Sequence, residues 1–302
     1  MAGRESKIIA IAGGKGGVGK SFTSANLAMA LANYGKKTIV IDLDLGGSNL
    51  HTFLGLPNNN PGVGHFIKQK KDDLSEFIVK TPMENLEFIP GDGINPFLAN
   101  ITHYQKLNII KGIKALEGDF IILDLGAGTS YNILDFFSIA DKGVLITNSD
   151  FVSIISMLGF LKNFLFRLFL QVTKGINKST FLLLDKLFHR VEEETPLTVN
   201  FILEKLKEWD EKSAKQIENL CNRYKPGVIF NRGEDEEEIK VINQFKKPLR
   251  KVLSLEMDYL GFIYDDPLIK ESLKNKKPFF VTNQNSKTAD EFMRIAEKLC
   301  QL

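Results

Sequence analysis

Apolar runs of strand length alternate with helical segments along most of the chain. Residues 7–12 form the first run, and the segment from Phe22 to Tyr34 behind it carries apolar side chains at helical spacing. Further strands are expected at residues 37–41, 86–89, 120–124, 143–148, 227–232 and 260–264, and further helices at 103–116 and 289–302. Strands that alternate with helices are typical of a parallel sheet with helices on both faces. The pattern therefore predicts an α/β fold with a mainly parallel, doubly wound sheet.

One interval departs from this alternation. Close to eighty residues separate the strand that ends at Asn148 from the strand that begins at Gly227, whereas one helix and its loops need about half of that length. The excess, residues 162–222, is predicted to be a helical insertion, and its first apolar face includes Phe160, Leu161, Phe164, Leu165, Leu168 and Phe169. Helices packed on their own core and on the sheet edge are the favoured interpretation. A partner or dimer surface and a basic amphipathic helix at a membrane surface are the alternatives.

The later part of the insertion carries a further helical pattern. Pro196 is expected to open a third helix, and the apolar positions continue through Leu203, Leu206, Ile217 and Leu220. The whole chain, residues 1–302, is expected to form one domain around the sheet, with the insertion inside it.

Composition narrows the classes of protein that fit. The chain has 302 residues, of which 43% are hydrophobic, enough for a large core. A net charge of +2 gives no sign of a strongly basic nucleic-acid binder. Cys221 and Cys300 lack C-x-x-C spacing, which argues against a disulfide framework, a zinc site or an iron–sulfur cluster and fits a reducing cytoplasm. No signal-peptide core precedes the first strand, and no apolar run reaches the ~18 residues that span a bilayer.

The strongest local signal is the loop between the first strand and the first helix. From Gly14 to Ser21 it fits the phosphate-binding pattern of a glycine, four residues and then Gly-Lys-Ser. The glycines let backbone N–H groups curl around a phosphate, and the following helix directs its positive end to the same place. Lys20 is expected to reach the β and γ phosphates, and the Ser21 hydroxyl to ligate Mg²⁺. An ordinary glycine-rich turn is the alternative, and the flanking strand and helix count against it.

Two predicted strands end in carboxylates. Residues 37–41 lead into Asp42 and Asp44, and residues 120–123 lead into Asp124. In an open parallel sheet, ligands bind outside the carboxyl ends of the strands, where these side chains would lie. Asp124 is expected to bind Mg²⁺ through its water shell, as a Walker-B aspartate does. For Asp42 and Asp44, turn formation and helix capping are the alternative to a role in the site.

Lys15 is unusual in a phosphate-binding loop. Residues 14–21, Gly-Lys-Gly-Gly-Val-Gly-Lys-Ser, resemble the deviant loop of the MinD/ParA family of ATPases. The resemblance implies a P-loop nucleoside triphosphatase fold of the SIMIBI type, slow hydrolysis of ATP with Mg²⁺, stimulation by an unidentified protein partner, and a homodimer that forms with ATP. In that family the early lysine of one subunit reaches the phosphates bound by the other, which gives Lys15 a role like an arginine finger. An exposed lysine that only adds positive charge is the alternative.

The same resemblance assigns roles to further residues. It implies that Asp44 orients the attacking water, that Asp42 supports Mg²⁺ through water, and that residues 45–55 and 126–128 are switch segments. Asn231-Arg232 matches a family dipeptide, and Asn231 can offer a donor and an acceptor to an adenine edge. The residues expected to bind the nucleotide are Gly14, Lys15, Gly16, Gly17, Val18, Gly19, Lys20, Ser21, Phe22, Asn231 and Arg232. The expected catalytic residues are Lys15, Lys20 and Asp44, and the expected metal-binding residues are Ser21, Asp42 and Asp124.

The cellular role is expected from the finer details of the resemblance. Asp-Leu-Gly-Ala-Gly-Thr at residues 124–129 is most similar to the flagellar-number regulators of the MinD branch (FlhG/FleN), which implies control of the placement or number of a bacterial structure such as flagella or the division site. A chromosome or plasmid partition ATPase is the main alternative, although the charge does not favour nucleic acid. An iron–sulfur carrier of the same fold would need paired cysteines. Residues 297–302 lack the basic amphipathic anchor of MinD-type proteins, so a cytoplasmic location is expected, with a peripheral position at the membrane as the alternative.

Overall fold

A single sheet organises the chain. The computed structural model describes residues 6–91, 100–189, 197–238, 240, 253 and 255–302. In this part of the chain, eight strands lie in the order β3-β4-β2-β5-β1-β6-β7-β8, and every neighbouring pair is parallel except β3 and β4. The strands are β1 (Lys7–Ala12), β2 (Thr38–Leu43), β3 (Val79–Lys80), β4 (Leu86–Ile89), β5 (Phe120–Leu125), β6 (Lys142–Thr147), β7 (Gly227–Gly233) and β8 (Asp258–Tyr264). The predicted doubly wound, mainly parallel sheet is confirmed.

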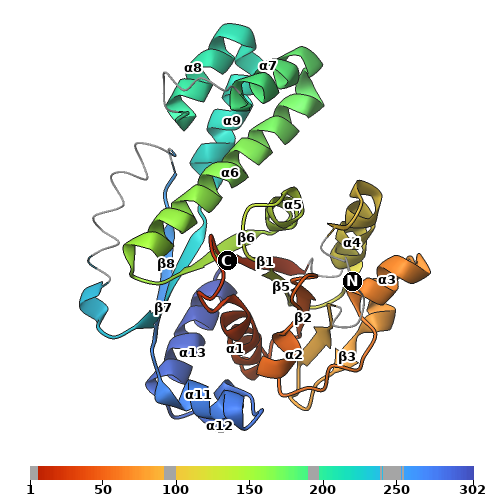
Figure 1. The fold of residues 1–302 in the computed structure, drawn as a ribbon, viewed down its shortest axis with the longest axis vertical. Coiled ribbons are helices and arrows are strands. Elements are labelled where there is room, and N and C mark those ends of the chain that lie inside the picture. Colours follow the sequence, from red (N-terminus) through yellow and green to blue (C-terminus); the bar gives the residue numbers. More distant parts are fainter. Residues whose placement is uncertain (1–5, 92–99, 190–196, 239, 241–252, 254) are drawn as a thin grey trace.

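Helices cover both faces of this sheet (Figure 1). One face carries α1 (Lys20–Asn33), α2 (Leu50–Phe53), α11 (Pro267–Lys274), α12 (Phe279–Thr282) and α13 (Lys287–Cys300). The other face carries α3 (Val63–Gln69), the short helix η1 (Leu74–Phe77), α4 (His103–Ala115), α5 (Tyr131–Ser138) and α6 (Phe151–Ile176). A second short helix, η3 (Glu236–Glu238), follows β7. Because the central strands are buried on both faces, they appear in the sequence as continuous apolar runs.

The two faces form two separate hydrophobic clusters, and the strand period explains which residue joins which. In β1, Ile8 and Ala10 pack on the α4–α6 side, whereas Ile9 and Ile11 pack on the α1–α13 side. Successive side chains of a strand point to opposite faces, so a shift of one residue would exchange the two sets. The register places the carboxyl ends of β1, β2 and β5 at one edge, with Ile11 beside Asp124 and Asp42 beside Asp124.

The helical insertion extends away from the sheet at the top of Figure 1. It consists of α6 together with α7 (Lys178–Phe188), α8 (Val199–Trp209) and α9 (Glu211–Arg223). Asp150, Asn177, Thr198 and Asp210 each accept a backbone N–H at the start of the next helix, which is the usual way to satisfy a helix N-terminus. The buried apolar residues of all four helices belong to the hydrophobic cluster on the α4–α6 side of the sheet.

Two details of the insertion differ from the sequence pattern. The expected start at Lys162 falls in the middle of α6, which runs without interruption from Phe151 to Ile176. The apolar positions of residues 203–220 belong to two helices, because Asp210 ends α8 and caps α9. Pro196 lies outside the described residues.

Helix α6 is both long and apolar. By length and composition alone it could cross a membrane, with a mean hydropathy of 1.5 over its best window, of which 39% is buried inside the protein. Lys162 and Arg167 interrupt the apolar run, as expected from the sequence, but the average over the helix stays apolar. One such helix is a weak indication, since Phe160, Phe164 and Phe169 are fully buried and the core helices of soluble proteins have the same character.

Candidate nucleotide site

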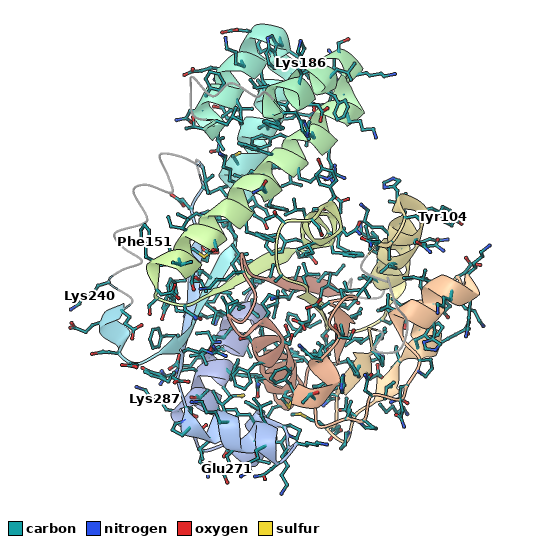
Figure 2. The ribbon with its side chains drawn as sticks, viewed as in Figure 1. Tyr104, Phe151, Lys186, Lys240, Glu271 and Lys287 are labelled. Carbon is teal, nitrogen blue, oxygen red and sulfur yellow. The ribbon has the colours of Figure 1, made fainter. Side chains whose placement is uncertain are left out.

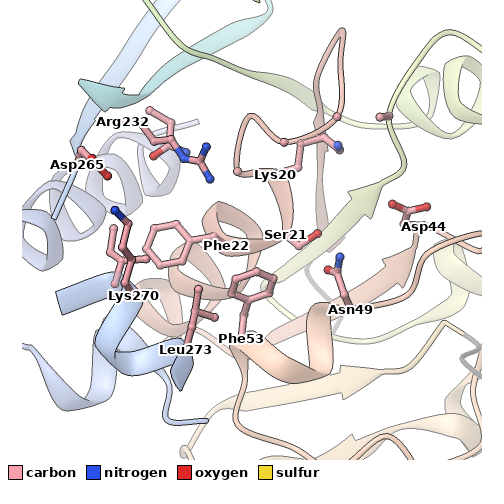
Figure 3. A pocket seen from close by; sticks show the side chains of 16 residues that line it. Lys20, Ser21, Phe22, Asp44, Asn49, Phe53, Arg232, Asp265, Lys270 and Leu273 are labelled. Carbon is pink, nitrogen blue, oxygen red and sulfur yellow. The ribbon is translucent and has the colours of Figure 1, made fainter. Parts of the chain in front are cut away.

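A cavity of about 500 Å³ lies at the carboxyl ends of the central strands, where the loop between β1 and α1 meets the ends of β7 and β8. Figure 3 shows Lys20 and Ser21 on the loop, Asp44 toward one end of the cavity, and Arg232, Asp265 and Lys270 toward the other. The lining residues are Gly16, Gly17, Gly19, Lys20, Ser21, Phe22, Asp44, Asn49, Phe53, Ala127, Asn231, Arg232, Asp265, Ile269, Lys270 and Leu273. Its volume falls in the range of small-molecule and cofactor sites.

The loop has the backbone that a phosphate site requires. Gly17 and Gly19 have φ angles of 79° and 96°, which L side chains rarely adopt. Gly19 is also the N-cap of α1, and no side chain caps this helix end. The N–H groups of the first turn are therefore left for an external acceptor, and the helix dipole favours an anion there. Lys20 begins the helix with only 7% of its surface exposed.

Asp124 lies behind the loop and is completely buried. The Ser24 hydroxyl donates to its Oδ1 at 2.8 Å, whereas Oδ2 has no hydrogen-bond partner among the described residues. Burial raises the pKa of Asp124 to about 6, against the opposing effects of the Ser21 and Ser24 hydroxyls and the charge of Lys20. An unpartnered buried carboxylate oxygen is costly unless a cation or an ordered water satisfies it. The residues here therefore fit a divalent cation such as Mg²⁺, which takes carboxylate oxygens and serine hydroxyls as ligands, directly or through water.

Asp42 is the neighbour of Asp124 across β2 and β5. Its two oxygens accept the backbone N–H groups of Asp44 and Leu50, both at 3.1 Å, and so they close the turn that follows β2. Burial, together with the negative charge of Asp124, raises the pKa of Asp42 to about 8. Two carboxyls this close and this buried resist ionising together, so the pair favours a cation nearby or a bound proton.

Asp44 lies between the two loops that the sequence marks as switch segments. Its side chain lines the cavity, and its carboxylate lies close to Gly47 and Gly126, where an added Cβ would come within 3.7 Å and 3.1 Å of Oδ1. The carboxylate thus lines the cavity close to both Gly47 and Gly126.

Asn231 joins the far end of the site to the loop. Its side-chain N–H donates to the Val18 carbonyl at 2.7 Å, and its Oδ1 is buried without a partner among the described residues. The next residue, Arg232, has a left-handed φ of 58° at an irregularity of the β7–β8 pairing, and its side chain is exposed to the cavity. Non-glycine residues in this conformation are uncommon and concentrate at functional sites.

Gly14 and Lys15 face away from the cavity, toward α6. A Cβ on Gly14 would lie 2.0 Å from the Ser156 carbonyl oxygen, so only glycine fits where the loop touches the backbone of α6. The Lys15 ammonium lies 3.6 Å from Asp150, the N-cap of α6, and about a third of the lysine side chain is exposed. Lys15 does not line the cavity formed by its own chain.

Comparison with known proteins agrees with this geometry. Residues 9–279 match the family model described as the CobQ/CobB/MinD/ParA nucleotide-binding domain. The chain belongs to this family. It is 33% identical over 151 residues to the septum site-determining protein MinD of Escherichia coli, a match that covers 49% of this chain and 55% of that protein. The chain spans about half the length of the curated relatives it matches.

Solved structures of the CobQ/CobB/MinD/ParA family share the fold. The septum site-determining protein MinD of Pyrococcus horikoshii, complexed with Mg-ADP, superposes with a TM-score of 0.61 at 22% identity and covers 97% of this chain and 96% of its own. A plasmid partition protein of Borrelia burgdorferi bound to AMPPNP gives a TM-score of 0.60 at 18% identity, over 98% of this chain and 99% of its own. At these identities the likeness supports the fold alone.

The structure brings most of the predicted residues together. Lys20, Ser21, Asp44, Asn231 and Arg232 line one cavity, together with Gly16, Gly17, Gly19 and Phe22. Asp42 and Asp124 lie directly behind it, whereas Val18 and Gly14 support the loop from the side. The Phe22 ring packs edge-on against Phe53, Phe279 and Phe292, so this side chain belongs to the core wall of the cavity.

Three polar residues in or behind this cavity were missed in the sequence. Ser24 lies one turn after Ser21 on α1, and helical spacing could have placed it beside Asp124. Asp265 directly follows β8, so the rule for strand ends applies to it as well. Lys270 gives no local signal, because its position depends on how α11 packs.

Proposed function

We propose that the chain binds ATP with Mg²⁺ and hydrolyses it with water as the nucleophile. The observation that carries the proposal is the arrangement of Asp124, whose free Oδ2 is buried directly behind a phosphate loop that carries Lys20 and Ser21. A structural carboxylate would be expected to have both oxygens satisfied. A carboxylate kept for a metal ion next to bound phosphates accounts for the free oxygen.

The residues divide the work of hydrolysis between binding and positioning. Lys20 and the loop N–H groups bind and neutralise the β and γ phosphates, and Ser21 and Asp124 hold the metal ion. The bound Mg²⁺ supplies charge neutralisation and orients the phosphate oxygens. Asp44 accepts a hydrogen bond from the attacking water and directs it toward the γ phosphate. Turnover by one chain alone is slow, because a second subunit and a protein partner must complete the catalytic site.

Lys15 is the residue that we assign to the second subunit. The contact between its ammonium and Asp150 holds it away from the cavity of its own chain, with an exposed end. In an ATP-bound dimer, Lys15 exchanges Asp150 for the phosphates of the facing subunit, where the negative charge is greater. ATP then favours the dimer, and hydrolysis releases it.

For the cellular role we propose regulation of the placement or number of a bacterial structure, such as flagella or the division site, in the cytoplasm or at the membrane surface. The similarity to MinD proteins and the sequence Asp-Leu-Gly-Ala-Gly-Thr at residues 124–129 support this role. A partition ATPase is the alternative, although the net charge of +2 does not favour nucleic acid. An iron–sulfur carrier is less well supported, because Cys221 and Cys300 pack on opposite faces of the sheet.

The test compares Asp44→Ala with Asp72→Ala, which removes an exposed carboxylate outside the cavity. Asp44→Ala should keep ATP binding, lose at least tenfold in phosphate release, and accumulate as a dimer in light-scattering measurements with ATP and Mg²⁺. Asp72→Ala should behave as the unmodified chain. Unchanged turnover in Asp44→Ala would remove Asp44 from the catalytic role.

Lys15→Ala tests the dimer separately. It should bind ATP with little change in affinity and remain monomeric, because its own cavity does not use this lysine. Normal dimers from Lys15→Ala would refute the role in the second subunit and leave the hydrolysis proposal standing.

A further inference from the structure

A second cavity lies where the helical insertion meets the body of the protein. It has a volume of about 220 Å³ and is lined by α4, α5, α6 and α7, none of which contributes a lining residue to the nucleotide cavity. The lining residues are His103, Lys106, Leu107, Ile110, Asp135, Ser138, Ile139, Arg167, Leu170, Gln171, Lys174 and Phe181. The four helices can be followed in Figure 1. We call this cavity the α4–α7 cleft.

A buried network of charges forms its floor. The Asp135 side chain is only 6% exposed and pairs with Lys106, which is equally buried. Arg167 donates to both carboxylate oxygens of Asp135, from Nε at 2.7 Å and from Nη2 at 2.9 Å, and Gln171 donates at 2.8 Å. Burial opposes the charge of Asp135, but the Arg167 and Lys106 contacts hold its pKa below the usual range. One carboxylate therefore lies among several fixed donors.

Positive charge exceeds negative charge in the cleft. Lys106, Arg167 and Lys174 face a single carboxylate, and among the described residues Lys174 has no ion-pair partner. Arg167 uses two of the five N–H donors of a guanidinium on Asp135, and its Cζ lies over the Tyr131 ring, 4.4 Å from the ring centroid. The remaining donors of Arg167 and the ammonium of Lys174 are therefore available to a second acidic group.

The rim of the cleft is apolar. Leu107 on α4 is 50% exposed, and Phe181 on α7 and Ile110 on α4 are partly exposed next to it. Leu107 lies on the otherwise polar outer face of α4, one turn from Tyr104, which is also exposed and is labelled in Figure 2. Arg167 and Lys174 therefore lie in the same cleft as exposed apolar side chains. Such a surface suits a carboxylate that has an apolar group next to it.

We propose that the α4–α7 cleft binds an acidic segment of a protein partner, with a carboxylate against Lys174 and Arg167 and a neighbouring apolar side chain against Leu107 and Phe181. The size of the cleft selects this occupant. Small-molecule sites usually span about 300–1,000 Å³, and 220 Å³ is smaller than that range. A peptide needs to bury only one or two side chains, while the rest of the segment lies across the exposed surfaces of α4 and α7.

The probe is a library of random 12-residue peptides displayed on phage, selected against the full chain without nucleotide and in the presence of a chelator. Selection is repeated against Lys174→Glu and Leu107→Asp, two exposed positions whose substitution leaves the buried network intact. The matched control is Lys186→Glu, which makes the same charge reversal at the outer end of the insertion, away from the cleft (Figure 2). Thermal unfolding of each variant checks that the fold is unchanged.

We expect the selected peptides to carry Asp or Glu next to Leu, Ile or Phe. Their synthetic versions should bind the unmodified chain and Lys186→Glu equally, and Lys174→Glu or Leu107→Asp at least tenfold more weakly. Replacement of the acidic residue in the peptide by its amide should cause a similar loss. Selection of peptides without an acidic residue, or binding that ignores both cleft variants, would overturn the proposal. Self-association of the chain that Lys174→Glu abolishes would also overturn it, in favour of a second copy in the cleft.

Because the selection uses no nucleotide, its result does not depend on the ATPase proposal. Failure of one leaves the other standing.

Discussion

Replacement of Gly14 by alanine tests the contact between the phosphate loop and α6. The added Cβ would lie 2.0 Å from the Ser156 carbonyl oxygen, 2.1 Å from its carbon and 2.6 Å from the Met157 nitrogen. All three are backbone atoms of a helix whose inner face is fully packed, so no side chain can turn away to make room. Either the loop or α6 must move by more than 1 Å.

The structure gives the size of the effect. Overpacking in a well-packed region costs about 1–3 kcal/mol, and each 1 kcal/mol lowers the melting temperature by about 2–4 °C in chains of 150–250 residues. A displacement of about 1 Å in a positioned site can also cost ~100-fold in function. We therefore expect Gly14→Ala to melt a few degrees lower and to bind ATP at least tenfold more weakly.

The assay is thermal unfolding together with titration of a fluorescent ATP analogue in Mg²⁺. Gly16→Ala and Gly159→Ala are the controls for stability, since an added Cβ at either position meets nothing within 4 Å. Gly159 lies within α6, and alanine should stabilise the helix there by up to ~1 kcal/mol. If Gly14→Ala melts and binds as the unmodified chain does, the loop does not rest on α6 in solution and the reasoning is refuted.

Three further variants test the buried charges and the loop contact. Asp42 has a pKa raised to about 8 against ~3.9 in an unfolded chain, so the folded state holds the extra proton between these values. Stability of the metal-free protein should therefore fall as pH rises from about 4 to 8 and level off above that, and Asp42→Asn should flatten that slope in urea unfolding with a chelator present. Asn231→Asp removes the N–H donor to Val18 and adds a negative charge beside the phosphates, so ATP should bind at least tenfold more weakly; equal affinity would show that the contact is dispensable. Asp135→Asn leaves Lys106 buried without its counter-charge and should cost about 3–5 kcal/mol in urea unfolding, whereas a loss below ~1 kcal/mol would mean that water reaches the network.

Most of the sheet could be predicted because its strands are buried on both faces. The runs that become β1, β2 and β5 are apolar at nearly every position, and each leads into a glycine loop or a carboxylate. The strand β3 has only two residues, and α2 and η1 have four each, which is too short to show a period. The position of β3 depends on its pairing with β4, that of α2 on its contact with α1, and that of η1 on its contacts with α3 and α4.

The part of the site that could be predicted is the part built from strand ends and the loops that follow them. Lys20, Ser21 and Asp124 follow from that rule alone, because parallel strands deliver their carboxyl ends to one edge. The use of Asn231 was harder to foresee. Its side-chain N–H donates to the Val18 carbonyl, and only the packed structure shows that its Oδ1 has no partner among the described residues, so the contact with an adenine edge stays a prediction. The raised pKa of Asp42 has the same origin, since burial is a property of the fold.

Helix α6 shows why the rest needed the structure. Its periodicity indicates which face is buried, but the atoms that cover that face come from distant parts of the chain: Gly14 against Ser156 near one end and Asp135 beside Arg167 further along. At about 1.5 Å per residue, its 26 residues span roughly 39 Å. A single rigid element therefore touches the phosphate loop near its start and the α4–α7 cleft beyond its middle. Gly159 lies only three residues before Lys162, yet α6 stays helical from Phe151 to Ile176, so no boundary between core and insertion lies at Lys162. The physical consequence is that a displacement of α6 by the loop acts on the same helix that carries Arg167 to Asp135.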